Sequence, residues 1–159
     1  MVALKILCLA GLLAIAIQDF KERKVYTGLL IAVITLMSIL FILRVDGLIY
    51  IRNITVNLAI LLFIIGVLVV YTTFKMQQPL QQALGWGDIL FFIGIALGFP
   101  ITTFLVLFTF SLCFALGVFL LLKPTLKEKT VPLAGLQAFF FLLVFITQWS
   151  FPKIHLYTF

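Results

Sequence analysis

Charged side chains are scarce in this chain. Only 10% of its 159 residues are Asp, Glu, Lys or Arg, and just five of them are acidic. A soluble globular protein carries about 25% charged residues, whereas 65% of this chain is hydrophobic and its mean hydropathy is +1.33. The composition therefore excludes a water-soluble protein and indicates an integral membrane protein.

Cysteine and histidine are almost absent. Cys8 and Cys113 lie alone in apolar runs, without a CxxC pair or a nearby histidine, which argues against a disulfide or a zinc site. The single histidine, His155, lies near the C-terminus, and the chain has no HExxH sequence. A zinc protease and a Ser/His/Asp or Cys/His hydrolase are therefore excluded, and we expect neither a metal nor a cofactor.

Long apolar runs fill most of the chain. They are continuous rather than alternating, which favours helices over barrel strands, and a helical span needs about 20 residues. We expect an all-α polytopic membrane protein with one domain over residues 1–159. Its six transmembrane helices are predicted at 2–18, 26–44, 53–74, 85–99, 101–122 and 132–150. The fourth is short, and a re-entrant segment there would leave five spans.

The basic residues lie in the connections between the predicted spans. With six spans, seven of them fall on one side: Lys21, Arg23, Lys24, Lys75, Lys123, Lys127 and Lys129. Four fall on the other side: Lys5, Arg44, Arg52 and Lys153. Because basic loops stay in the cytosol, this distribution favours six spans with both termini on the non-cytosolic side. It also explains the net charge of +6 without a nucleic-acid partner.

Two aspartates stand at the ends of apolar runs. Asp19 follows the first run, and Asp88 follows Gly85-Trp86-Gly87 and opens the fourth. An acid within reach of the bilayer is costly and usually functional, and the predicted topology puts both acids at the cytosolic face. We therefore interpret them as a carboxylate pair that shares a proton and activates water.

The glycines beside Asp88 have two interpretations. They permit backbone conformations closed to other residues and let a substrate chain approach the carboxylate closely. Alternatively, Asp88 is only the N-cap of a helix that follows a glycine turn.

The pattern resembles the type IV prepilin peptidases and archaeal preflagellin peptidases, which are membrane-embedded aspartyl proteases of the GxGD class. The tetrapeptide 85–88 matches the family signature, residues 19–25 resemble its first motif, and the segment from Val131 resembles the proline-led start of its last helix. The resemblance implies that Asp19 and Asp88 are catalytic. It gives supporting roles to four other residues: Gly85, Gly87, Arg23 and Pro132.

The resemblance also implies a substrate and a location. The expected partners are prepilin-like single-span proteins and membrane lipid, in a bacterial or archaeal inner (cytoplasmic) membrane. The chain departs from the family pattern where Tyr26 and Thr27 replace Pro and Asn, and where Leu90 replaces Lys. It also lacks the methyltransferase insertion of larger members, so it would be a short form.

Two other functions compete with the peptidase. Intramembrane acids also relay ions in proton-coupled transporters, although such sites usually lie near the bilayer midplane. A non-catalytic assembly factor with a peptidase-like fold is the second alternative.

Overall fold

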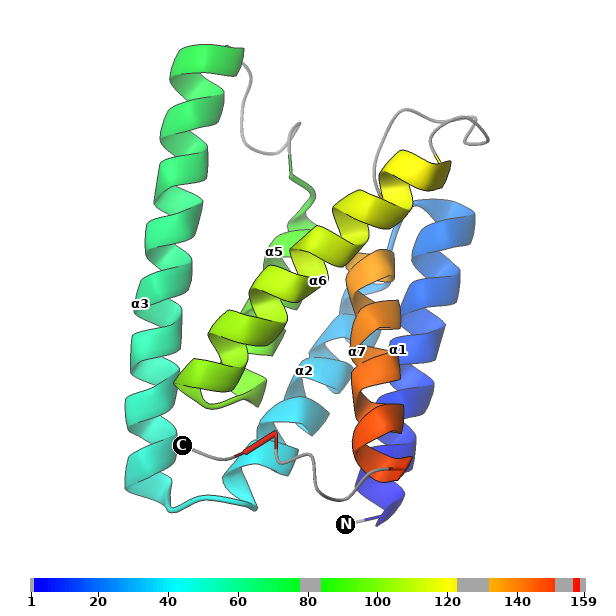
Figure 1. Ribbon diagram of the computed structural model, residues 1–159, viewed down its shortest axis with the longest axis vertical. Helices are drawn as coiled ribbons and strands as arrows, with labels where there is room; N and C mark the ends of the chain where they lie inside the picture. Colours follow the sequence, from blue (N-terminus) through cyan, green and yellow to red (C-terminus); the bar gives the residue numbers. More distant parts are fainter. Residues whose placement is uncertain (1, 78–83, 123–131, 151–155, 158–159) are drawn as a thin grey trace.

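The computed structural model describes residues 2–77, 84–122, 132–150 and 156–157. These residues form six α-helices, which are α1 (Val2–Glu22), α2 (Thr27–Ile42), α3 (Gly47–Tyr71), α5 (Trp86–Gly98), α6 (Ile101–Leu122) and α7 (Leu133–Ser150). A short π-helical segment, η1 (Thr72–Met76), continues α3. The described part of the chain is helical, as the apolar runs predict, and Figure 1 shows its helices side by side in a bundle.

Two helices extend further than their apolar runs predict. α1 continues past residue 18 to Glu22, so Asp19 lies inside its last turn rather than after it. α3 begins at Gly47 instead of residue 53 and continues through η1 to Met76. The predicted boundaries followed hydropathy, but backbone hydrogen bonds continue a helix through polar residues at its ends.

Within the described parts of the chain, four helical segments are long and apolar enough to cross a membrane: α1, α3 together with η1, α6 and α7. α2 has 16 residues and α5 has 13. At 1.5 Å per residue, α5 is about 20 Å long, which is less than the roughly 30 Å of a hydrocarbon core. The structure thus supports a polytopic membrane protein, and the number of complete spans and the side of the termini stay predictions.

Two glycines of α5 let this helix lie close to α2. α2 packs most extensively against α5, and α1 against α7. A Cβ atom added at Gly94 of α5 would lie 2.7 Å from Ile34 Cγ1, and one at Gly98 would lie 3.1 Å from Met37 Cβ. Two small residues four apart are a common contact between membrane helices. In this chain they set the distance between α2 and α5.

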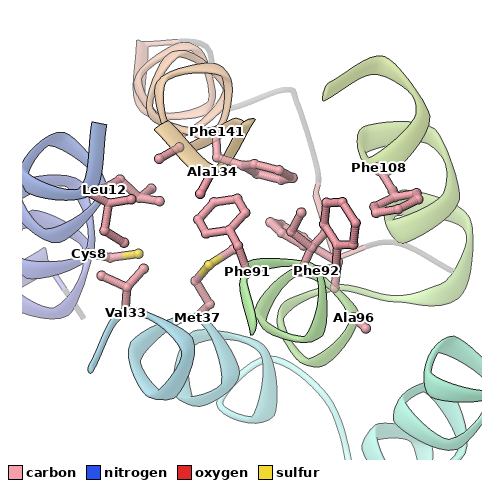
Figure 2. Packing of buried hydrophobic residues seen from close by; sticks show 14 of the residues in the cluster. Cys8, Leu12, Val33, Met37, Phe91, Phe92, Ala96, Phe108, Ala134 and Phe141 are labelled. Atoms are coloured by element: carbon pink, nitrogen blue, oxygen red, sulfur yellow. The ribbon is translucent and has the colours of Figure 1, made fainter. Parts of the chain in front are cut away.

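Aromatic rings fill the centre of the bundle, as Figure 2 shows. Phe141 of α7 stacks on Phe99 at a centroid distance of 5.6 Å and meets Phe91 of α5 edge-on at 6.1 Å. Phe92 meets Phe108 of α6 edge-on at 5.1 Å. These contacts join α5, α6 and α7 in one core.

The helices alternate in direction along the chain. α1 begins and α7 finishes at one end of the bundle, and α1 finishes at the other end, where α5 and α7 begin (Figure 1). We call this second end the carboxylate end, because Asp19 and Asp88 both lie there.

Candidate functional site

Asp19 lies in the last turn of α1 and is 7% exposed. Its Oδ2 atom accepts a hydrogen bond from the Gly135 backbone N–H at 2.6 Å. A buried carboxylate needs such a donor, because removing its charge from water is costly. The partner lies 116 residues further along the chain, so this bond joins α1 to α7.

Asp88 is the third residue of α5, whose N-cap is Gly85. Its Oδ2 accepts from the Gly85 N–H at 3.2 Å, and its Oδ1 accepts from the Ala134 N–H at 2.8 Å. The first bond closes the start of its own helix, as the acidic member of a capping box does. Asp88 is therefore not the N-cap itself, and its second bond reaches a different helix.

The two carboxylates meet at the start of α7. Pro132 accepts the first bond of this helix from the Leu136 N–H at 3.0 Å, so Pro132 is the N-cap. Ala134 and Gly135 are then the second and third helical residues, whose N–H groups have no acceptor within the helix. Their Cα atoms are about 3.8 Å apart. The structure thus places one carboxylate on each of two consecutive donors, at the positive end of the helix dipole.

Gly135 is a site residue that the sequence analysis did not identify. A Cβ atom here would lie 2.8 Å from Asp19 Cβ and 2.9 Å from Asp19 Oδ2. Any larger residue would displace the Asp19 side chain, so glycine is required for this approach. The available signal was a glycine in the first turn of a proline-led helix, where glycine is otherwise a poor helix former.

The glycines of the tetrapeptide act differently from each other. Gly85 is in an ordinary extended conformation (φ −68°, ψ 151°), and Gly87 also has no positive φ. The expectation that they adopt conformations closed to other residues is therefore wrong. A Cβ atom at Gly85 would lie 3.3 Å from Asp88 Oδ2, whereas one at Gly87 would make only ordinary contact with Leu30 at 3.8 Å. Gly85 gives room to the carboxylate, whereas no contact among the described residues requires glycine at 87.

Arg23 ends the helix that carries Asp19. It adopts a left-handed conformation (φ 55°), and its N–H donates to the Asp19 carbonyl oxygen at 3.1 Å. This conformation is uncommon for a residue with a side chain. Nearby, Gln18 Oε1 accepts from the Tyr26 N–H at 3.1 Å and so ties α1 to the start of α2. The first motif is therefore a tight turn beside the buried carboxylate.

Several sequence predictions lie outside the described residues. They concern the basic residues of the predicted fifth connection (Lys123, Lys127 and Lys129), together with Val131, Lys153 and His155. Within the described segments, no three His, Cys, Asp or Glu side chains gather in a way that would hold a metal ion.

The chain was compared with protein families, with curated proteins and with solved structures. The model of the type IV leader peptidase family matches residues 6–121. The match spans well over half of the chain and includes both aspartates, but it ends before α7. No curated protein and no solved structure was found to match.

Proposed function

Because the chain belongs to the type IV leader peptidase family, we propose that it is an aspartic-type endopeptidase in which Asp19 and Asp88 form the catalytic pair. The observation that carries this proposal is the meeting of the two carboxylates at Ala134 and Gly135. These acids lie 69 positions apart in the sequence (88 minus 19), yet consecutive backbone donors hold them. Two adjacent carboxyl groups are the requirement of aspartic protease chemistry.

The reaction follows from two acids that share one proton. One carboxylate removes a proton from water, and the oxygen of that water attacks the carbonyl carbon of the scissile bond. The other carboxyl group donates a hydrogen bond to the developing oxyanion and then protonates the leaving amine. Gly135 holds Oδ2 of Asp19, so we assign Oδ1 of Asp19 to the contact with the water. This contact does not decide which aspartate is the base, and either one fits that role.

The proposed substrates are prepilin-like proteins with a leader followed by one apolar helix. The pair lies where α1 ends and α5 begins, so we place the scissile bond near the membrane border, with the apolar helix of the substrate in the membrane. The residue before the cut is expected to be small, often Gly, because such a bond is easily unwound and closely approached. We place the protein in a bacterial or archaeal inner (cytoplasmic) membrane, with the carboxylate end at the cytosol.

The test is cleavage of a prepilin-like substrate by the purified full chain. Asp19→Asn and Asp88→Asn should each reduce cleavage to background, because neither can complete the acid–base pair. Asn keeps an acceptor oxygen for the α7 amides, so both variants should stay folded. Asp46→Asn is the matched control, since Asp46 is exposed at the start of α3 and makes no side-chain cap hydrogen bond.

The hydrogen bonds to α7 also favour a second candidate, a non-catalytic assembly or proton-coupled membrane protein in which the two carboxylates only cap a helix. That candidate predicts that the purified wild type cleaves no substrate, and that neither Asp→Asn change alters this. Cleavage by the wild type that both substitutions abolish would exclude it. Near-normal cleavage by either variant would remove that aspartate from the proposed mechanism.

A further inference from the structure

α3 carries two buried amides on a helix that is otherwise largely uncovered. Along Gly47–Tyr71, all of which the structure describes, the buried side chains are Asn53, Asn57 and Leu61. Asn53 is 1% exposed and Asn57 is 0% exposed. An amide buried in an apolar environment is costly unless it forms hydrogen bonds. These two residues therefore need specific partners.

Their partners are the backbone groups at the break between α5 and α6. Asn57 Nδ2 donates to the Ala96 carbonyl oxygen at 2.9 Å and to the Phe99 carbonyl oxygen at 2.8 Å. Asn53 Oδ1 accepts from the Ile101 N–H at 3.0 Å.

The sequence explains why these groups need partners. Pro100 cannot continue a helix, so α5 ends at Gly98 and α6 begins at Ile101. Helix ends leave carbonyl and N–H groups without intrahelical partners, and in lipid each must be satisfied by protein. The two asparagines supply those partners from outside the α5–α6 hairpin.

The two asparagines differ in whether they bind α5. Asn57 binds carbonyl groups at the C-terminal end of α5. Asn53 instead accepts from the first N–H of α6 and donates to the Ile49 carbonyl oxygen of its own helix at 2.7 Å. Asp88 lies at the opposite end of α5, about 12 Å from Ala96 along the axis at 1.5 Å per residue. Since α5 is one continuous helix of 13 residues, an axial shift at its C-terminal end also moves Asp88 near its start.

Apolar packing does not fix the axial position of α5 as sharply as these bonds do. Gly94 and Gly98 set how close α5 lies to α2, but dispersion contacts are individually weak and non-directional. A hydrogen bond has a defined length and angle. The two bonds from Asn57 therefore define where α5 stops along its own axis.

We propose that Asn57 is a positioning residue for the peptidase reaction, which sets the height of Asp88 relative to Asp19 at the start of α7. This inference rests on the proposed function, because it assigns Asn57 a role in that same site. Asn57 touches no reacting atom and acts through α5.

The prediction separates positioning from general stabilisation. Asn57→Leu replaces the amide with an apolar side chain of similar size and removes both bonds to α5. Asn53→Leu is the matched control, because it removes a buried amide from the same helix one turn away and leaves the α5 bonds in place. Both variants should lower the melting temperature. Only Asn57→Leu should lower kcat, by on the order of 10- to 100-fold, with KM little changed, because a small misplacement of a catalytic group has that effect.

A distance measurement tests the same inference without substrate. Spin labels at Trp86, which is 65% exposed at the start of α5, and at Leu143 on the exposed side of α7 report the position of α5. The background replaces Cys8 and Cys113. We expect the distance distribution to shift or broaden in Asn57→Leu and to match the wild type in Asn53→Leu.

The outcomes distinguish the two proposals. If the wild type cleaves no substrate, the proposed function fails, and the distance comparison still reports on the position of α5. If the wild type cleaves and the two asparagine variants have equal kcat values, the positioning role is overturned. An unchanged distance distribution in Asn57→Leu overturns it as well.

Discussion

Replacing Gly135 by alanine tests whether the close approach of Asp19 to α7 is part of the chemistry. The added Cβ would lie 2.8 Å from Asp19 Cβ and 2.9 Å from Oδ2, distances that real side chains do not tolerate. The Asp19 side chain must therefore move, and its 2.6 Å bond to the Gly135 N–H must lengthen or break.

The expected magnitude follows from the bond that is lost. A hydrogen bond to a charged group contributes about 1.5–3 kcal/mol, and a factor of ten in rate corresponds to about 1.4 kcal/mol. If the bond orients Asp19 in the transition state, cleavage should slow by roughly 10- to 150-fold. Overpacking should also destabilise the fold by about 1–3 kcal/mol.

The assay compares kcat/KM for a prepilin-like substrate and the melting temperature of the same samples. Gly117→Ala is the control, because its Cβ would meet nothing within 4 Å, and alanine is the better helix former. We expect Gly117→Ala to cleave normally. A Gly135→Ala variant that cleaves at the wild-type rate would refute the reasoning, since Asp19 would then need no defined position against α7.

Three further predictions concern packing, protonation and topology. Gly94→Leu should separate α2 from α5 and lower the melting temperature. Gly66→Leu should have little effect, because a side chain at 66 would enter open space. Equal melting temperatures of the two variants would contradict the packing of α2 against α5. The cleavage rate should fall on both sides of an optimum pH, because one carboxyl group must be ionised and the other protonated; a rate that changes in only one direction would contradict the shared proton. Single cysteines at positions 22 and 128, in a cysteine-free background, should react with membrane-impermeant thiol reagents only from the cytosolic side. Labelling from the outside alone would contradict the proposed orientation.

Some of this architecture follows from sequence because it depends on local properties. The length of the apolar runs determines the helical membrane class. Proline and glycine mark where α5 ends and where α7 begins. The scarcity of acids singled out Asp19 and Asp88 as candidate site residues, because a carboxylate in an apolar chain is costly and usually functional.

The rest depends on which helices pack together, which one sequence does not reveal. The role of Gly135 appears only once α1 lies against α7. The role of Asn57 depends on carbonyl groups 39 and 42 positions further along the chain. The role of Asn53 depends on an N–H group 48 positions further along. The expectation about glycine conformations failed because a glycine signal does not distinguish an unusual backbone from a close neighbour.

Because Asp19 and Asp88 hold the start of α7, the proposed mechanism assigns the fold and the chemistry to the same two side chains. An inactive relative would still need these two acceptors to stabilise α7. The presence of the two acids alone is therefore a weak indication of activity in any chain of this kind. On the proposed mechanism, Asn at either position would keep one acceptor oxygen for α7 and end the chemistry. Such a change would produce a protein that folds, inserts and competes for substrate without cutting it. In a cell that also holds the active form, a variant with one such substitution would therefore inhibit cleavage by binding the same substrate.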